Sequence, residues 1–126
     1  MKRAVFSEKA PKPIGPYSQA VIFGNLVFCS GQIPIDLVTG ALETGPIEKQ
    51  AKTVFNNIAT ILEAAGSDLS RALKITLYFK DLAHFEKVNQ IYAEYFEQGD
   101  LPARAAVQVA RLPKDALIEA DAIAYI

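Results

Sequence analysis

The chain has 126 residues, of which 51% are hydrophobic and 21% charged, and its formal net charge at pH 7 is -1. This length and composition predict one globular domain over residues 1–126 with a single sizeable core. The 13 Lys and Arg residues nearly balance the 14 Asp and Glu residues, and no basic run is interleaved with aromatic residues. A nucleic acid is therefore not an expected partner.

Metal, disulfide and cofactor chemistry find little support in the composition. Cys29 is the only cysteine and His84 the only histidine, which excludes an internal disulfide and a thiolate metal cluster. There is no phosphate loop and no dinucleotide-binding fingerprint. Apolar runs are too short for a signal peptide or a membrane span. We expect a cytoplasmic protein that needs no metal and no cofactor.

The N-terminal third predicts strands around a restrained loop. Residues 2–6 are predicted as a short edge strand, and residues 10–16, with three prolines, as a loop. Residues 17–23 and 26–30 are rich in β-forming residues, and Gly24-Asn25 between them favours a tight hairpin.

The second strand of this hairpin is apolar on both sides. Leu26, Phe28 and Ser30 share one face, whereas Val27 and Cys29 share the other. A strand with two apolar rows is typical of the middle of a sheet.

Two helices and two further strands follow. Apolar residues recur every 3.6 positions over residues 47–65, and Gly66 is a stop signal. Residues 73–80 alternate as a strand with one apolar face. Asp81 is a candidate N-cap for a second helix that reaches residue 96, with Asn89 on its apolar stripe. Residues 117–126 predict the last strand.

An arginine opens the strand expected within residues 101–110. Arg104, Ala106 and Gln108 point to one side of this strand, and apolar residues point to the other. A planar guanidinium between small neighbours suits a carboxylate. The alternative is an arginine paired with an acidic residue at an interface, and this stretch alone leaves both open.

The element order β-β-β-α-β-α-β-β predicts an α+β sheet whose two helices cover one face. The opposite face should be more apolar than a monomer usually exposes, which indicates a homo-oligomer with clefts between subunits. We expect this face to carry Val27, Cys29, Thr76, Tyr78, Glu119, Asp121, Ile123 and Tyr125.

Several residues outside the Arg104 strand are candidates for chemistry. Glu119 and Asp121 share a face of the last strand and suit acid/base work, or ion pairing at an interface. Tyr17 follows a rigid Gly-Pro, which would hold its phenol in place, although a structural hydrogen bond is the alternative. Ser30-Gly31-Gln32 ends a strand and favours bare backbone N–H groups for an anion or a carbonyl oxygen.

Several short motifs follow one another along the chain. They are Pro13-Ile14-Gly15-Pro16-Tyr17-Ser18-Gln19-Ala20, Ser30-Gly31-Gln32-Ile33-Pro34, Val88-Asn89-Gln90-Ile91-Tyr92, Pro102-Ala103-Arg104 and Ala110-Arg111-Leu112-Pro113-Lys114-Asp115. Together and in this order they resemble the Rid family, also called YjgF-like, of reactive-intermediate deaminases. The resemblance runs from about residue 6 to residue 124.

This resemblance implies a fold, an assembly and a reaction. The fold would be chorismate-mutase-like α+β, and the assembly a homotrimer with sites between subunits. The reaction would be hydrolysis of small-molecule 2-imino acids, such as 2-iminobutanoate and 2-iminopropanoate, to 2-keto acids and ammonia. These imines and their enamine tautomers are released by pyridoxal-phosphate dehydratases.

The resemblance also assigns residues. Arg104 matches the family's carboxylate-binding arginine, and Tyr17, Ser30, Gly31, Asn89 and Glu119 match other positions that line its pocket. Imine hydrolysis needs a bound carboxylate, an aimed water and a proton relay, for which Glu119 is the candidate, with Tyr17 assisting.

One position departs from the family, and two other functions stay open. Many members carry a cysteine where this chain has Ala106, which argues against a covalent thiol and leaves substrate preference open. A regulatory module that binds small carboxylic acids would use the same arginine. Family members are also described as translation inhibitors and ribonucleases, although the sequence has neither a basic groove nor a pair of histidines.

Overall fold

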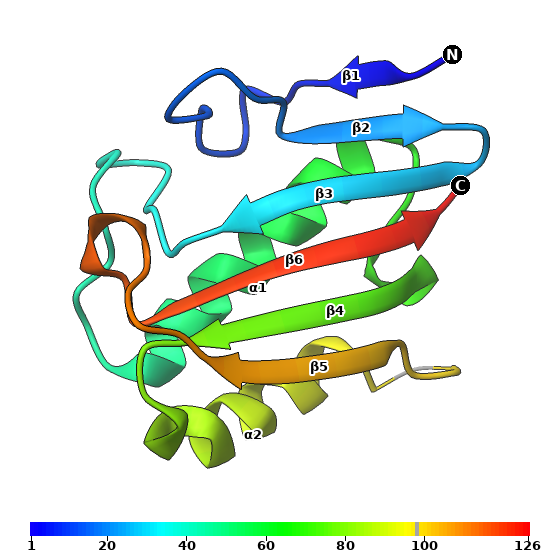
Figure 1. Ribbon diagram of the computed structural model, residues 1–126. Coiled ribbons are helices and arrows are strands. Elements are labelled where there is room, and N and C mark those ends of the chain that lie inside the picture. Colours follow the sequence, from blue (N-terminus) through cyan, green and yellow to red (C-terminus); the bar gives the residue numbers. More distant parts are fainter. Residues whose placement is uncertain (98) are drawn as a thin grey trace.

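The computed structural model describes residues 1–97 and 99–126 and confirms the α+β fold, with two helices on one face of a mixed sheet (Figure 1). The sheet order is β1-β2-β3-β6-β4-β5, in which β4 and β5 are parallel and the other neighbours antiparallel. The elements are β1 (Arg3–Val5), β2 (Ala20–Phe23), β3 (Leu26–Gln32), α1 (Ile47–Ala64), β4 (Ala72–Phe79), α2 (Phe85–Tyr95), β5 (Ala103–Gln108) and β6 (Ile118–Tyr125).

Both helices end or begin where the sequence signals indicate. The chain leaves α1 through Gly66, whose φ of +85° lies in the left-handed region that glycine adopts without strain. Asp81 caps a short 3-10 turn, η2 (Leu82–His84), where its carboxylate accepts a hydrogen bond from the Ala83 backbone N–H at 2.9 Å. The helix α2 continues directly from this turn.

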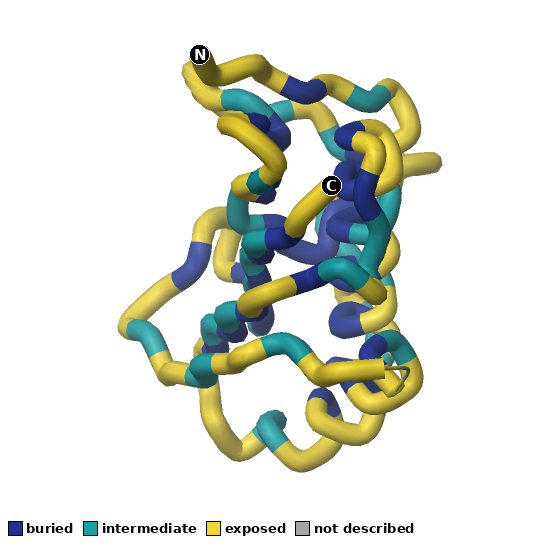
Figure 2. The backbone as a smooth tube through the Cα atoms, turned by 90° about the vertical axis from the view of Figure 1, so that its right-hand side faces the viewer, coloured by how far each residue is buried: buried dark blue, intermediate teal, exposed yellow. Residues whose placement is uncertain are grey.

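The core lies between the sheet and the helices, as the buried segments in Figure 2 show. Val54, Phe55 and Ile58 of α1 are fully buried there, together with Ile75, Leu77 and Phe79 of β4. None of the helices in the described part of the chain combines the length and the apolar character needed to cross a membrane.

The sheet face away from the helices carries several of the expected residues, but the assignment of β3 to it was wrong. Val27 pairs with Ala124 across β3 and β6, and Val27 and Cys29 are buried on the helix face. Phe28, which is 44% exposed, lies on the open face instead. Both rows of β3 are apolar, so alternation alone does not decide which row meets the helices.

One strand boundary differs from the prediction, one register shift was not predicted, and both shape the site described below. The strand predicted from residue 17 begins only at Ala20, so Tyr17 lies in a loop. The pairing of β3 with β6 shifts register between Cys29 and Gln32, which leaves Ser30 and Gly31 in an irregular segment. Bulges of this kind re-aim side chains and backbone next to functional sites.

Candidate functional site

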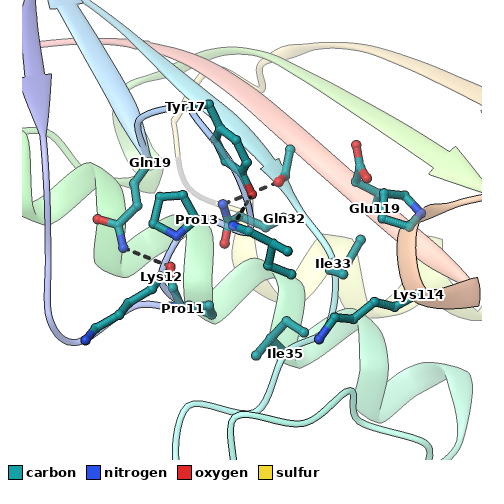
Figure 3. A pocket seen from close by; sticks show the side chains of 13 residues that line it. Pro11, Lys12, Pro13, Tyr17, Gln19, Gln32, Ile33, Ile35, Lys114 and Glu119 are labelled. Carbon is teal, nitrogen blue, oxygen red and sulfur yellow. Dashed lines mark hydrogen bonds between the residues drawn. The ribbon is translucent and has the colours of Figure 1, made fainter.

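A cavity of about 380 Å³ lies beside this irregular segment of β3, next to the start of β6 (Figure 3). Tyr17 and Glu119 lie on opposite sides of it. The cavity walls are otherwise mainly apolar and proline-rich, with two lysines. The full lining is Pro11, Lys12, Pro13, Ile14, Tyr17, Gln19, Gly31, Gln32, Ile33, Ile35, Pro113, Lys114 and Glu119.

Glu119 is the acidic group of this cavity. It lies on β6 opposite Tyr78 of β4 and is half-buried. Burial raises the pKa of Glu119 above its ordinary value, and the negative charge of Asp121 raises it further. Within residues 1–97 and 99–126, no basic nitrogen lies within salt-bridge distance of its carboxylate. The Glu119 carboxyl therefore keeps its proton to a higher pH than an ordinary glutamate does.

Gly31 provides the space that the Glu119 carboxylate occupies. A Cβ added at Gly31 would collide with Oε2 of Glu119 and lie only 2.9 Å from its Cδ. Any side chain at this position therefore displaces the carboxylate. The role of Gly31 here is close approach, because its φ does not fall in the left-handed region.

Ser30 differs from the expectation of bare backbone donors. Its backbone N–H donates to the Gln19 carbonyl at 2.9 Å, and its hydroxyl donates to the Ser18 carbonyl at 2.6 Å. The N–H of Ser30 is therefore already used within the chain. The hydroxyl fixes the segment that precedes β2, while its oxygen keeps lone pairs for accepting a hydrogen bond.

Tyr17 is held by its own loop. Its hydroxyl accepts a hydrogen bond from the Ile14 backbone N–H at 3.2 Å, and the side chain remains 49% exposed. The sequence interpretation missed Gln19, which is 1% exposed and fastens this loop. Its amide donates to the carbonyls of Ser7 at 3.1 Å and Pro11 at 2.9 Å. The sequence did contain a signal for Gln19, because this residue belongs to the motif that begins at Pro13.

Arg104 lies on the helix face of β5, an edge strand. It is in register with Ile75, whose side chain is buried under the helices. Its Nη1 donates to Oδ1 of Asn89 at 2.7 Å, and its guanidinium carbon lies 4.7 Å from the Tyr92 ring centre and 5.3 Å from that of Phe85. No carboxylate of the described residues lies within salt-bridge distance of it. Among the described residues of one subunit, Arg104 thus has no acidic partner, and the alternative of an ion pair at an interface stays open.

The predicted site residues therefore form two groups rather than one. Tyr17, Gly31 and Glu119 share the cavity, with Ser30 next to Gly31 in the same segment of β3. Arg104 and Asn89 line a separate depression of about 610 Å³ beside α2. Strand β4 lies between β5 and β6, and Arg104 and Glu119 point to opposite faces of the sheet.

A metal centre is not supported in the part of the chain that the structure describes. No group of three or more His, Cys, Asp or Glu residues is placed there so that it could hold a metal ion. The Glu119 cavity contributes a carboxyl with a raised pKa and the phenol of Tyr17, and the depression beside α2 contributes the guanidinium of Arg104.

Comparison with known proteins identifies the class to which this fold and these residues belong. The family model described as endoribonuclease L-PSP matches residues 7–126. The chain belongs to this family, which is the Rid (YjgF-like) family that the motifs indicate.

Individual relatives span nearly the whole chain. A RutC family protein of Pyrococcus abyssi is 56% identical over 98% of this chain and 97% of its own length. The human 2-iminobutanoate/2-iminopropanoate deaminase is 44% identical over 98% of this chain and 90% of its own. The crystal structure of Escherichia coli TdcF with bound serine matches with a TM-score of 0.94 and 39% identity, covering 98% of each chain.

Proposed function

We propose that this protein is a deaminase that hydrolyses 2-imino acids, such as 2-iminobutanoate and 2-iminopropanoate, to 2-keto acids and ammonia. One observation carries the proposal. A half-buried carboxyl, Glu119, and a guanidinium, Arg104, each lack an ionic partner in the described chain and lie on opposite faces of one sheet. Each is half of a site for a small molecule that has a carboxylate and a reacting centre.

The two halves meet when subunits assemble. Arg104 lies on an edge strand, whereas the Glu119 cavity opens beside the face that the helices leave uncovered. That face exposes Phe28, Val107 and Tyr125, each more than 40% exposed. Burying such residues favours association. We infer a homotrimer in which Arg104 of one subunit faces the Glu119 cavity of the next.

Each residue has a defined task in the reaction. Arg104 holds the substrate carboxylate with two charge-assisted hydrogen bonds, which places the C=N carbon beside Glu119. Glu119 takes one proton from water while the water oxygen bonds to that carbon and the π electrons of the C=N bond move to the nitrogen. Glu119 passes this proton to the nitrogen, which gives a carbinolamine. Glu119 then takes the proton of the carbinolamine hydroxyl and passes it to the nitrogen as the C–N bond breaks, so that ammonia leaves and the carbonyl forms.

The raised pKa of Glu119 supports this role. A carboxyl whose pKa lies closer to neutrality exchanges protons with water and an amine more readily than one at its ordinary value. Tyr17 assists from the opposite side of the cavity, where its hydroxyl is available to orient the attacking water. The name of the human relative, a 2-iminobutanoate/2-iminopropanoate deaminase, supports the same substrate class.

The direct test is turnover of freshly generated 2-iminobutanoate, followed by the release of 2-oxobutanoate above the spontaneous rate. We expect turnover that persists in the presence of a metal chelator. Tight binding of 2-oxobutanoate without turnover would instead indicate a module that only binds carboxylic acids. Cleavage of RNA by the same preparation, without imine hydrolysis, would favour the ribonuclease activity after which the family model is described.

Light scattering tests the assembly on which the site depends. A stable monomer at micromolar concentration would contradict both the trimer and the site between subunits.

Mixing two inactive variants is a sharper test of the site between subunits than light scattering. Refolding Arg104→Ala together with Glu119→Gln should restore about a quarter of the sites, because the intact Arg104 of one subunit then meets the intact Glu119 of the other. A site within one subunit would give no recovery.

A further inference from the structure

Three residues of α2 surround the guanidinium of Arg104. Phe85, Asn89 and Tyr92 follow one another at spacings of four and three residues, so they share one face of the helix. Phe85 and Tyr92 place their rings 5.3 and 4.7 Å from the guanidinium carbon, and Asn89 accepts the hydrogen bond from Nη1 at 2.7 Å. We call these three residues the guanidinium cradle.

The cradle leaves one edge of the guanidinium for a ligand. Nη1 is the nitrogen cis to Cδ, so its bond to Asn89 does not use the edge formed by Nε and Nη2. That edge presents two parallel N–H groups, the arrangement that binds both oxygens of a carboxylate. The two rings restrict the plane in which the edge can lie, because a cation is attracted to the face of an aromatic ring.

The tyrosine of the cradle is itself fixed by the core. Tyr92 is 7% exposed, stacks on Phe96 with ring centres 4.4 Å apart and meets the ring of Phe55 at 5.8 Å. Its buried hydroxyl has no hydrogen-bond partner among the described residues. A hydroxyl without a partner contributes no hydrogen bond that could orient the Arg104 guanidinium. Any orienting effect of Tyr92 on Arg104 must therefore come from its ring.

We infer that Phe85, Asn89 and Tyr92 are positioning residues that orient Arg104 so that its Nε and Nη2 edge receives the substrate carboxylate. This inference rests on the proposed function, in which Arg104 is the carboxylate-binding residue. It assigns the aromatic face of α2 a role in substrate affinity besides its role in the core. A lysine in place of Arg104 could not use the same cradle, because its ammonium is a point charge with no plane to orient.

The first test measures Arg104 without any ligand. The chain has four arginines, so the Nε–H signals in a nitrogen-15 NMR spectrum are few, and Arg104→Lys identifies the signal of Arg104. We expect this signal to be shifted upfield by the two rings. Tyr92→Leu should move it toward the other three arginines, and Tyr92→Phe should not. An unshifted Arg104 signal in the native protein would overturn the cradle.

The second test measures affinity for 2-oxobutanoate by calorimetry. Tyr92→Leu should weaken binding by about 3- to 10-fold, the range expected for loss of a partly exposed cation–π contact, and Tyr92→Phe should bind as the native protein does. Tyr95→Leu is the matched control. Tyr95 lies on the same helix and packs on Phe55 at 5.3 Å, but its hydroxyl donates to Asn56. Within the described residues, the rings close to the Arg104 guanidinium are those of Phe85 and Tyr92, and its hydrogen bond goes to Asn89.

The outcomes separate the cradle from general packing and from the proposed function. Equal losses of affinity in Tyr92→Leu and Tyr95→Leu would show that only packing is involved and would overturn the inference. If Tyr92→Leu does not fold, Phe85→Leu takes its place, because Phe85 is only half-buried. A native protein that binds no 2-oxobutanoate would contradict the proposed function, while the Arg104 signal would still decide whether the cradle orients the guanidinium.

Discussion

The two ends of the candidate site are built in contrasting ways. At the Glu119 cavity, a carboxyl lies half-buried against a glycine, without a hydrogen bond or ion pair to the described residues, and its surroundings raise its pKa. At the Arg104 end, an exposed guanidinium is held by one amide and two aromatic rings. The first environment shifts the protonation equilibrium of the Glu119 carboxyl, and the second restricts the orientation of the Arg104 guanidinium.

Under the proposed function, this contrast corresponds to two different tasks, proton transfer at Glu119 and carboxylate binding at Arg104. A group that moves a proton gains from burial, because desolvation brings its pKa toward the working pH. A group that binds a carboxylate gains from a fixed plane and from access to the ligand, and it needs no change in its own protonation. Changes to the Glu119 end should therefore affect the rate of the chemical step, and changes to the Arg104 end should affect substrate capture.

The largest expected effect is that of Glu119→Gln. The amide keeps the size of the side chain but cannot take a proton from water, so kcat should fall by about 10²- to 10⁴-fold. Affinity for 2-oxobutanoate should change much less, because in the proposed function Arg104 rather than Glu119 holds the carboxylate. Steady-state kinetics together with calorimetry checks both expectations. Full turnover with weakened assembly would mean that Glu119 only braces an interface.

Arg104→Ala should come next, with its main effect on kcat/KM. Loss of a bidentate charged partner costs about 2 to 5 kcal/mol, which is roughly 30-fold to several thousand-fold in kcat/KM. Arg104→Lys should also be impaired, since an ammonium does not reproduce the two parallel hydrogen bonds. Size-exclusion chromatography with light scattering serves as the control. Dissociation of the oligomer by Arg104→Ala, with a normal rate in any remaining trimer, would favour the interface ion pair.

Gly31→Ala should have an intermediate effect that depends on Glu119. The new Cβ would collide with the Glu119 carboxylate, and a displacement of about 1 Å at a reacting group costs up to about 100-fold in rate. The expected loss is in kcat, measured on the native protein and on Glu119→Gln. If Gly31 acts through Glu119, the alanine should cost much less in the Glu119→Gln background. An equal loss in both would point to a direct contact between Gly31 and the substrate.

The fold was predictable wherever one face of an element is apolar and the other polar. The helix α1 and strand β4 have such one-sided patterns, and the sequence places both within one residue of their observed ends. Strand β3 has two apolar rows, so its alternation carries no information on which row faces the helices. Only its pairing with Ala124 of β6, a contact between distant parts of the chain, decides the question.

The candidate site was predictable as a set of residues but not as two separate groups. Arg104 stands out as a charge in an apolar strand, and Tyr17, Gly31 and Glu119 stand out through motifs or shared faces. That Arg104 points toward α2 depends on the parallel pairing of β4 with β5, which local sequence does not specify. The contact of α2 with Arg104 could not be predicted from the apolar stripe of this helix, because helical spacing does not distinguish packing in the core from contact with a guanidinium.

The smallest effect should be at Cys29, which tests whether the two ends of the site account for the activity by themselves. Cys29 is 5% exposed on the helix face of β3, and burial raises the pKa of its thiol to about 12, with a further contribution from Asp121. At neutral pH almost no thiolate forms, and the thiolate is the reactive species. Native protein treated with a thiol-blocking reagent should therefore keep its full rate of imine hydrolysis.

Cys29→Ala should keep kcat and KM as well. Its free energy of unfolding should fall by about 1 kcal/mol because of the small cavity, which thermal unfolding measures. Loss of turnover in a folded and assembled Cys29→Ala would mean that the chemistry requires a group beyond Glu119, Tyr17 and Arg104.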